Sequence, residues 1–164
     1  MNDVHSFFPL FIDINGKKVL IIGAGKVAYR KAVTLLKYGA DITVITKQIK
    51  EEKFNNLKNI RIITEEFSEK FIENIFMVIA ATDNPLLNEK IYKLCSKKNI
   101  LVNNITSKTE MNCRFAAVLD TEEYTIGISA KGNPQKAKEL REKIQLTLDL
   151  WYYMRRWYFW VQKN

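Results

Sequence analysis

The chain has 164 residues, of which 47% are hydrophobic and 27% are charged. This composition predicts one compact soluble domain, or one domain with a helical extension, and no apolar run approaches the ~20 residues of a membrane span. The first residues carry neither the basic region nor the cleavage site of a signal peptide, so we expect none.

Two distant cysteines, Cys95 and Cys113, predict free thiols in a reducing cytoplasm. The single histidine, His5, excludes a multi-histidine metal site within one chain, and we expect no metal.

The formal net charge is +8, and it is unevenly distributed. Residues 131–164 contain eight basic and three acidic side chains. Such an excess suits an anionic partner, for which nucleic acid, an acidic membrane and a small polycarboxylate or phosphate ligand are the candidates. A solvated, lysine-rich surface without any partner is the alternative.

Short apolar runs alternate with helical patterns through the first two thirds of the chain. The pattern predicts strands over 18–23, 41–46, 60–64, 76–82 and 100–104, and helices over 26–38, 48–58 and 85–98. Continuous apolar strands separated by helices are typical of parallel sheets that are covered on both faces. With right-handed crossovers, the sequence predicts an α/β, doubly wound, Rossmann-like sheet.

The pattern changes after residue 110. Strands are predicted over 113–119 and 124–130, and only four residues, Asp120–Glu123, join them, which requires an antiparallel hairpin. A helix follows, with Asn133 as its N-cap and Pro134 in its first turn. Its apolar face is formed by Ala137, Leu140, Ile144, Leu148 and Trp151.

A hairpin and one helix bury little apolar surface by themselves, so this part of the chain must pack on something else. A second copy of the chain is the simplest candidate. We therefore expect two domains, residues 1–112 with the Rossmann-like sheet and residues 113–164 for dimerisation.

A glycine-rich turn joins the first predicted strand to the first predicted helix. Gly23, Gly25 and Ala28 have the G-x-G-x-x-A spacing of dinucleotide-binding loops. The first glycine permits the tight turn, the second allows the backbone to approach a pyrophosphate, and the alanine lets the helix pack on the strand. The N–H groups at the start of the helix then face the phosphates. The alternative is a turn with a structural role only.

The end of the second predicted strand lacks the acidic residue that usually binds the adenosine ribose. Asp41 stands at the opposite end of this strand, whereas Thr46, Lys47 and Gln48 occupy the expected position. These side chains can hydrogen-bond a ribose, and Lys47 also tolerates a 2′-phosphate. The ribose position therefore leaves both NAD and NADP open.

The fourth predicted strand ends beside the same crevice, where open α/β sheets bind their ligands. Ala81, Thr82 and Asp83 occupy this end. Asp83 and Asn84 are also candidates for capping the helix that starts at Pro85, and the two roles are compatible.

Taken together, these segments resemble the precorrin-2 dehydrogenase/sirohydrochlorin ferrochelatase module of siroheme synthases. The resemblance runs through FFPLFIDINGKKVLIIGAGKVAYRKAVTLLKYGADITVI, with a short strand before the glycine loop, and through VIAATDNPLLNEKI, ILVNNIT, FAAVLD and YTIGISAKGNPQKAKELREKI. Members of this family also lack the ribose acid. The resemblance implies that NAD accepts a hydride from precorrin-2, a polycarboxylate tetrapyrrole, which becomes sirohydrochlorin.

The resemblance also implies roles for individual residues. Family members position NAD through residues that match Lys26, Val27, Lys47 and Gln48. The cofactor-binding residues are then Gly23, Ala24, Gly25, Lys26, Val27, Thr46, Lys47, Gln48, Ala81 and Thr82. The substrate-binding candidates are Asn103, Asn104, Lys108, Arg114 and Lys131, with Lys26 and Arg30 as further basic residues near the crevice.

The sequence departs from the family at one catalytic position. Bifunctional members carry an aspartate just after the fifth strand, and here Thr106 matches it. A threonine does not ionise near neutral pH and cannot act as a general base. We therefore expect dehydrogenation, which depends mainly on positioning, and poor iron insertion, which must remove two pyrrole protons. Asp83 and His5 are the alternative bases.

Three other readings stay open. The first is a bifunctional dehydrogenase and ferrochelatase, and the second is a non-catalytic module that senses NAD. The third is a nucleic-acid or membrane adaptor, because aromatic residues and arginines alternate in WYYMRRWYFWVQKN. However, Trp151, Met154, Tyr158 and Val161 continue the apolar face of the last helix, which favours dimer packing or substrate covering. We expect no nucleic acid and no membrane among the partners.

Overall fold

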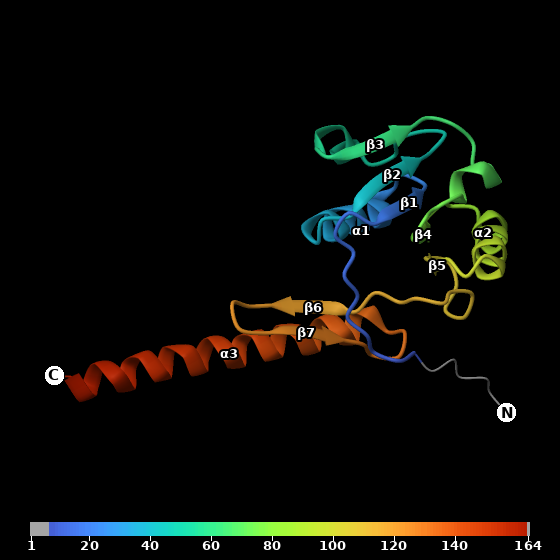
Figure 1. Ribbon diagram of the computed structural model, residues 1–164. Coiled ribbons are helices and arrows are strands. Elements are labelled where there is room, and N and C mark those ends of the chain that lie inside the picture. Colours follow the sequence, from blue (N-terminus) through green and yellow to red (C-terminus); the bar gives the residue numbers. More distant parts are fainter. Residues whose placement is uncertain (1–6, 164) are drawn as a thin grey trace, which may run out of the picture. The chain divides into compact units, whose positions relative to one another are not determined.

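The computed structural model describes the backbone of residues 7–163 and the side chains of residues 7–155. The chain divides into two compact units, with the boundary between Arg114 and Phe115 (Figure 1). The first unit holds the parallel sheet and its helices. The second unit holds a hairpin and a long helix.

Five parallel strands form the sheet of the first unit. They are β1 (Lys18–Ile22), β2 (Asp41–Ile45), β3 (Ile60–Ile63), β4 (Met77–Ala80) and β5 (Leu101–Asn104). Their order is β3-β2-β1-β4-β5, so the chain moves outward from β1 in both directions. Ile21 pairs with Val44 on one side and with Ile79 on the other, and all three are fully buried. The predicted doubly wound sheet is confirmed, and its switch point lies between β1 and β4.

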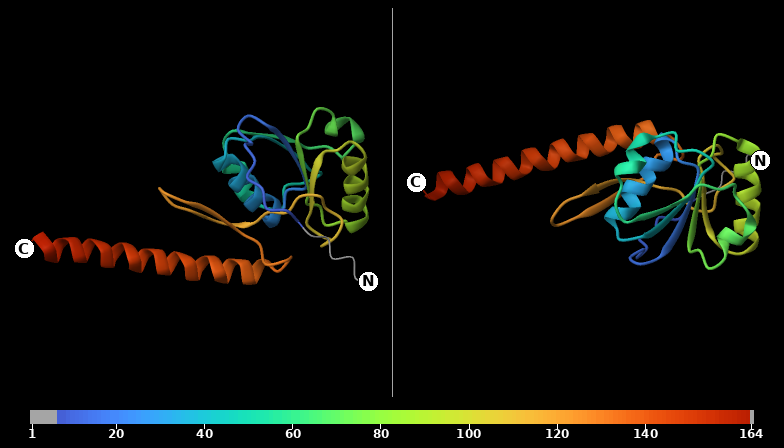
Figure 2. Two further views of the ribbon diagram at one scale, coloured as in Figure 1. Left: turned by 60° about the horizontal axis from the view of Figure 1, so that its bottom comes forward. Right: turned by 90° about the horizontal axis from the view of Figure 1, so that it is seen from above.

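Two helices cover opposite faces of this sheet (Figure 2). α1 (Lys26–Lys37) packs on β1 and β2, and α2 (Pro85–Lys97) packs on β4 and β5. Opposite faces follow from the topology, because right-handed crossovers that leave the switch point in opposite directions place their helices on opposite sides. Small residues, Ala28 and Ala32, let α1 lie close against the strands.

The helix predicted over residues 48–58 is absent. The structure has only short 3-10 turns here and farther along, η1 (Glu52–Asn56) and η2 (Glu69–Ile72). The backbone N–H groups of Lys50 and Glu51 both donate to the carbonyl oxygen of Ala24, at 3.0 Å each. These two bonds attach the chain to the glycine loop as far as residue 51. Farther along, Asn59 adopts a left-handed φ of 62°, which turns the chain. Because Lys50 and Glu51 donate to Ala24, their N–H groups do not form the bonds of the α-helix that the local pattern predicted.

Two further expectations fail at strand boundaries. Residues 7–14 form no strand within the described part of the chain, and Phe8, Leu10 and Phe11 are exposed. The strand predicted from residue 113 begins at Ala117 instead, in β6 (Ala117–Asp120). The reason is that the N–H of Cys113 donates to the carbonyl of Val102, 3.2 Å away, so this segment borders β5.

The second unit contains the predicted hairpin and helix. β6 pairs antiparallel with β7 (Thr125–Ile128), and the N–H of Thr121 donates to the carbonyl of Tyr124 to close the turn. α3 (Pro134–Lys163) begins as predicted, because the N–H of Lys136 donates to the Asn133 side chain at 3.0 Å.

A small core joins the hairpin to the first turns of α3. It contains Leu119, Ile128 and Ala137. The rest of the predicted apolar face receives less cover, since Leu140 is 48% and Trp151 54% exposed. None of the helices in the described part of the chain has the length and the apolar composition of a membrane span.

Candidate functional site

The glycine loop leaves β1 where two other strands end beside it. Gly23 has a φ of +104°, and a Cβ on it would collide with the backbone carbonyl of Ala81, just after β4. Its N–H donates to the carbonyl of Ile45 at the end of β2, at 2.8 Å. Only glycine fits at position 23, because the turn needs both a left-handed φ and close contact with the neighbouring strand.

Gly25 plays a different part, as the N-cap of α1. A Cβ on Gly25 would meet nothing within 4 Å, so the space in front of it is open. The first helical bond runs from the N–H of Tyr29 to the carbonyl of Gly25, which leaves the N–H groups of Lys26, Val27 and Ala28 without an acceptor inside the helix. Within the described residues, no side chain caps this end of α1 and no acidic residue lies in its first turn. The loop therefore fits a pyrophosphate.

The polar residues after β2 are partly engaged with each other. The hydroxyl of Thr46, which is nearly buried, donates to the carbonyl of Gln48 at 2.7 Å and accepts from its N–H at 3.3 Å. The Lys47 ammonium lies 2.6 Å from the carboxylate of Glu66, and both side chains are exposed. Thr46 thus shapes this turn, and Lys47 and Gln48 lie at its surface beside the loop.

Asp83 and Asn84 follow β4, and only one of them caps α2. The Asn84 side chain accepts from the N–H of Leu87 at 3.2 Å and caps α2. The carboxylate of Asp83 instead contacts the Lys50 ammonium at 2.5 Å. This hydrogen bond holds the pKa of the Asp83 carboxyl below its usual value. A lower pKa makes Asp83 a weaker base.

A buried amide, which the sequence reading missed, joins the ends of β4 and β5. Asn88 of α2 is fully buried, and its side-chain oxygen accepts from the N–H and the hydroxyl of Thr82, at 3.2 and 2.7 Å. Its side-chain nitrogen donates to the carbonyl of Thr82 and to the hydroxyl of Thr106, at 3.0 and 3.2 Å. A polar residue four positions after the helix cap, on the apolar face of α2, was the only sequence signal.

Thr106 lies inside this network. Its hydroxyl donates to the side-chain oxygen of Asn104 at 2.8 Å, and its N–H donates to the same oxygen at 2.9 Å. The side-chain nitrogen of Asn104 is buried and has no hydrogen-bond partner among the described residues. Thr82 and Thr106, both predicted as site residues, are thus brought together by a residue that was not predicted.

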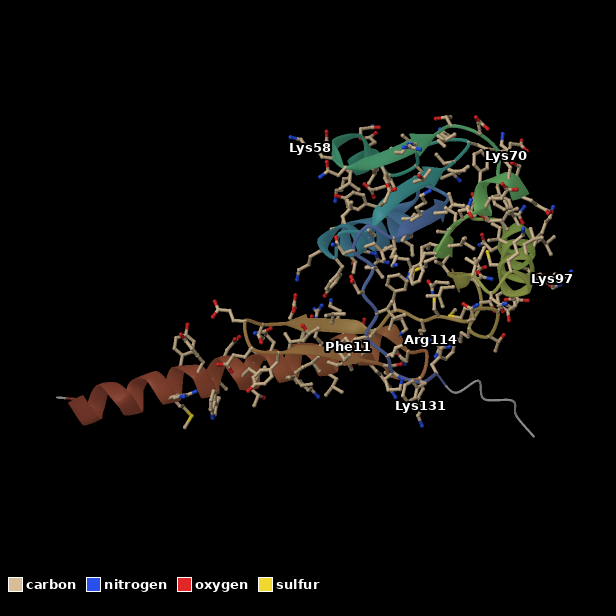
Figure 3. The ribbon with its side chains drawn as sticks, viewed as in Figure 1. Phe11, Lys58, Lys70, Lys97, Arg114 and Lys131 are labelled. Atoms are coloured by element: carbon tan, nitrogen blue, oxygen red, sulfur yellow. The ribbon has the colours of Figure 1, made fainter. Side chains whose placement is uncertain are left out.

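The predicted substrate ligands fall into three groups. Asn103 and Asn104 are buried, and the side-chain nitrogen of Asn103 donates to the carbonyl of Cys113 at 3.0 Å, so these residues support the following loop. Lys108 and Arg114 lie in that loop, where the guanidinium of Arg114 donates to the carbonyl of Lys108 at 2.8 Å (Figure 3). Lys131 belongs to the second unit, in a left-handed turn with φ 47°.

The guanidinium of Arg114 also lies over the ring of Phe7, 4.3 Å from its centre. Other cations of the first unit, Lys58, Lys70 and Lys97, point outward from the unit (Figure 3). These three lysines are therefore part of a solvated surface, whereas Lys108 and Arg114 lie on the loop that follows β5.

Both cysteines are free thiols. Burial raises the pKa of Cys95 to about 11 and that of Cys113 to about 12, so neither is a reactive thiolate near neutral pH. Among the described residues, no three His, Cys, Asp or Glu side chains gather where a metal ion would fit. His5, the alternative base, lies outside the described residues.

A family model described as "Putative NAD(P)-binding" matches residues 10–117. The chain belongs to this family. The match covers the sheet, the glycine loop and the loop that carries Thr106. The open space at Gly25 is what a dinucleotide-binding loop of such a family requires.

Several siroheme synthases are similar to this chain. Those of Actinobacillus succinogenes and Zymomonas mobilis are each 34% identical over 145 residues, which is 87% of this chain and 30% and 31% of theirs. That of Mannheimia succiniciproducens is 32% identical over 146 residues, again 87% of this chain and 31% of the relative. The chain thus spans about a third of the length of the siroheme synthases it matches.

A solved structure extends the similarity to both units. SirC, a precorrin-2 dehydrogenase, superposes with a TM-score of 0.72 at 25% identity, over 86% of this chain and 71% of that one. A match over 86% of the chain is longer than the first unit, Met1–Arg114, and so reaches into the second.

Proposed function

We propose that this protein oxidises precorrin-2 to sirohydrochlorin with NAD as the hydride acceptor. The main support for the proposal is the extent of the similarity. The match to a siroheme synthase covers 87% of this chain, and the match to SirC covers 86%. A glycine loop alone would support only nucleotide binding. The similarity also extends past that loop into the segments that end β4 and β5, where a substrate of an open α/β sheet binds.

The glycine loop supports the cofactor assignment. When bound, NAD supplies the hydride acceptor. The N–H groups of Lys26 and Val27 and the Lys26 ammonium are suited to hold its pyrophosphate, and the bare Gly25 lets that group approach the backbone. Ala24 belongs to the loop itself, and the backbone of Ala81 and Thr82 lies against Gly23.

The ribose position favours NAD over NADP. The Lys47 ammonium is paired with Glu66 at 2.6 Å, so the turn after β2 offers little net positive charge. A 2′-phosphate would bring its negative charge next to the Glu66 carboxylate, which is unfavourable. A ribose with a free 2′-hydroxyl needs only hydrogen bonds, and Gln48 is suited to supply one.

Dehydrogenation requires the substrate to lose a hydride from carbon and a proton to solvent or to a base. The chain contributes by holding the macrocycle against the cofactor, with Lys108 and Arg114 as partners for its carboxylates. Asn103 and Asn104 contribute indirectly, because their buried side chains hydrogen-bond the loop that carries Lys108 and Arg114. Close, oriented contact supplies much of the rate of such a transfer, and the transfer itself needs no ionised side chain as a base.

Iron insertion is a poorer fit to this site. The Thr106 hydroxyl accepts a hydrogen bond from Asn88 and donates its only proton to Asn104, so it is not available as a proton acceptor. Asp83 has a lowered pKa, which makes it a weaker general base. We therefore propose a dehydrogenase that inserts iron slowly.

The test is an anaerobic incubation of the protein with precorrin-2 and NAD⁺, followed through the absorbance of NADH. We expect stoichiometric NADH and sirohydrochlorin. Fe²⁺ or Co²⁺ is then added, and rapid metal insertion would favour the bifunctional alternative. Tight NAD binding without turnover of precorrin-2 would contradict the proposal and favour a non-catalytic NAD sensor.

A further inference from the structure

An ion pair crosses the edge of the sheet above the glycine loop. Lys50 follows β2 and Asp83 follows β4, and the order β2-β1-β4 places the end of β1 between them. The Lys50 ammonium nevertheless reaches the Asp83 carboxylate at 2.5 Å. The two side chains therefore span the point where the chain leaves β1 and enters Gly23–Gly25.

The backbone on both sides of this pair is held firmly. The N–H groups of Lys50 and Glu51 both donate to the carbonyl of Ala24, so Lys50 is attached to the glycine loop itself. On the other side, Thr82 is bound to the buried Asn88, and Asn84 caps α2. Since the backbone is held in this way, the long Lys50 side chain and the Asp83 carboxylate can change position without moving it.

The pair itself is easily exchanged. The Lys50 and Asp83 side chains are 58% and 79% exposed, and ion pairs in such surroundings contribute little stability. A dinucleotide that runs along this edge brings two pyrophosphate charges into the space that the pair spans. Such an anion attracts a lysine more strongly than one solvated carboxylate does, and it repels the carboxylate.

We propose that Lys50 is a cofactor-binding residue which leaves Asp83 and contacts the pyrophosphate when NAD binds. Asp83 competes for the lysine in the free protein and thereby sets the affinity. This inference rests on the proposed NAD site. The inference also assigns a role to the turn after β2, where a helix was predicted and did not form. The hydrogen bond from Lys50 to Ala24 holds this turn against the glycine loop and so brings the Lys50 ammonium close to the loop.

The test is a titration of NAD⁺ by calorimetry, with natural protein and variants at two salt concentrations. We expect Lys50→Ala to weaken binding about tenfold and to reduce its salt dependence, since it removes one cation from an anion site. Lys50→Arg should restore most of the affinity. Asp83→Asn should tighten binding about threefold, because it releases the lysine and removes a like charge.

The matched control is the pair of Lys93 and Glu89, which are also 2.5 Å apart but lie on the outer face of α2. Lys93→Ala and Glu89→Gln should leave the affinity unchanged. Natural affinity in Lys50→Ala, or weaker binding in Asp83→Asn, would overturn the inference while leaving the cofactor site intact. Failure of the natural protein to bind NAD⁺ would instead overturn the proposed function, and the role of Lys50 with it.

Discussion

The side-chain nitrogen of Asn88 lies 3.2 Å from the hydroxyl of Thr106, and that hydroxyl lies 2.8 Å from the side-chain oxygen of Asn104. Thr106 accepts from the first amide and donates to the second, so a neutral hydroxyl satisfies both. A carboxylate at this position would still accept from Asn88, but it would face the oxygen of Asn104. The network thus suits threonine, at the position where bifunctional family members have an aspartate.

An aspartate would nevertheless supply the general base that Thr106 lacks, so we expect Thr106→Asp to raise the rate of Fe²⁺ insertion about 10²-fold, the lower end of what a general base supplies. Dehydrogenation should change less than about threefold, because it depends on positioning. Thr106→Ser keeps the hydroxyl and is the control. If the natural protein already inserts Fe²⁺ well above the spontaneous rate and Thr106→Asp adds nothing, another group carries the proton chemistry, and Asp83 is the first to test.

The two loop glycines should respond differently to substitution. Gly25→Val should lose at least about tenfold in NAD affinity but keep its fold, since the side chain enters the pyrophosphate space and its Cβ meets no protein atom within 4 Å. Gly23→Ala should lower the free energy of unfolding by about 3 kcal/mol, through its left-handed φ and its collision with Ala81. Urea denaturation and NAD titration separate the two effects. Unchanged NAD binding in Gly25→Val would remove the cofactor assignment.

Glu66 should control the choice between NAD and NADP. It neutralises Lys47 at 2.6 Å, so Glu66→Gln frees a cation beside the ribose position. We expect the Kd for NADP⁺ to fall about fivefold, with little change for NAD⁺. Lys70 pairs with Glu65 at 3.7 Å, and Glu65→Gln is the neighbouring control. Equal effects of the two substitutions on NADP⁺ would mean that only the overall charge matters.

The chain should form a homodimer through its second unit. Leu146 and Leu150 of α3 are 63% and 65% exposed, more apolar surface than one chain covers. Light scattering at micromolar concentration should give twice the mass of the chain, and Leu150→Glu should shift it toward the monomer. Gln145→Ala, which removes no apolar side chain from α3, should have no effect. A monomeric natural protein would contradict this prediction.

Lys31 should make stability depend on pH. Burial lowers the pKa of its ammonium from 10.5 to about 8, an effect reinforced by Arg30 and opposed by Cys113. Between these values the unfolded chain binds more protons than the folded one, so stability rises with pH, and the full penalty applies below pH 8. The raised pKa of Cys113, about 12, acts in the opposite direction above its usual 9.0.

Lys31→Met should therefore raise the free energy of unfolding at pH 7 by about 1–2 kcal/mol, part of what a shift of this size represents. The gain should shrink at pH 9, as the natural lysine loses its proton. Thermal denaturation at the two values measures it. A gain that is the same at pH 7 and pH 9 would show that packing, and not ionisation, is responsible.

The sheet and the glycine loop were readable from the sequence because their signals are local. A run such as Val19–Ile22 is apolar at every position, as strands buried on both faces require, and Gly23 and Gly25 stand directly between a strand and a helix. The hairpin followed from a connection too short for a parallel return. Each of these conclusions depends on residues within a few positions of each other.

The pairing of side chains at the site was decided only by the tertiary structure. Lys50 and Asp83 are 33 positions apart, and they meet because β2 and β4 flank β1 in the finished sheet. Asn88 reaches Thr106 for a similar reason, since α2 lies over the ends of both β4 and β5. Even the missing helix at residues 48–58 reflects a distant partner, the carbonyl of Ala24. Periodicity records which face of an element is apolar, whereas contacts between loops depend on strand order, which emerges when the whole sheet assembles.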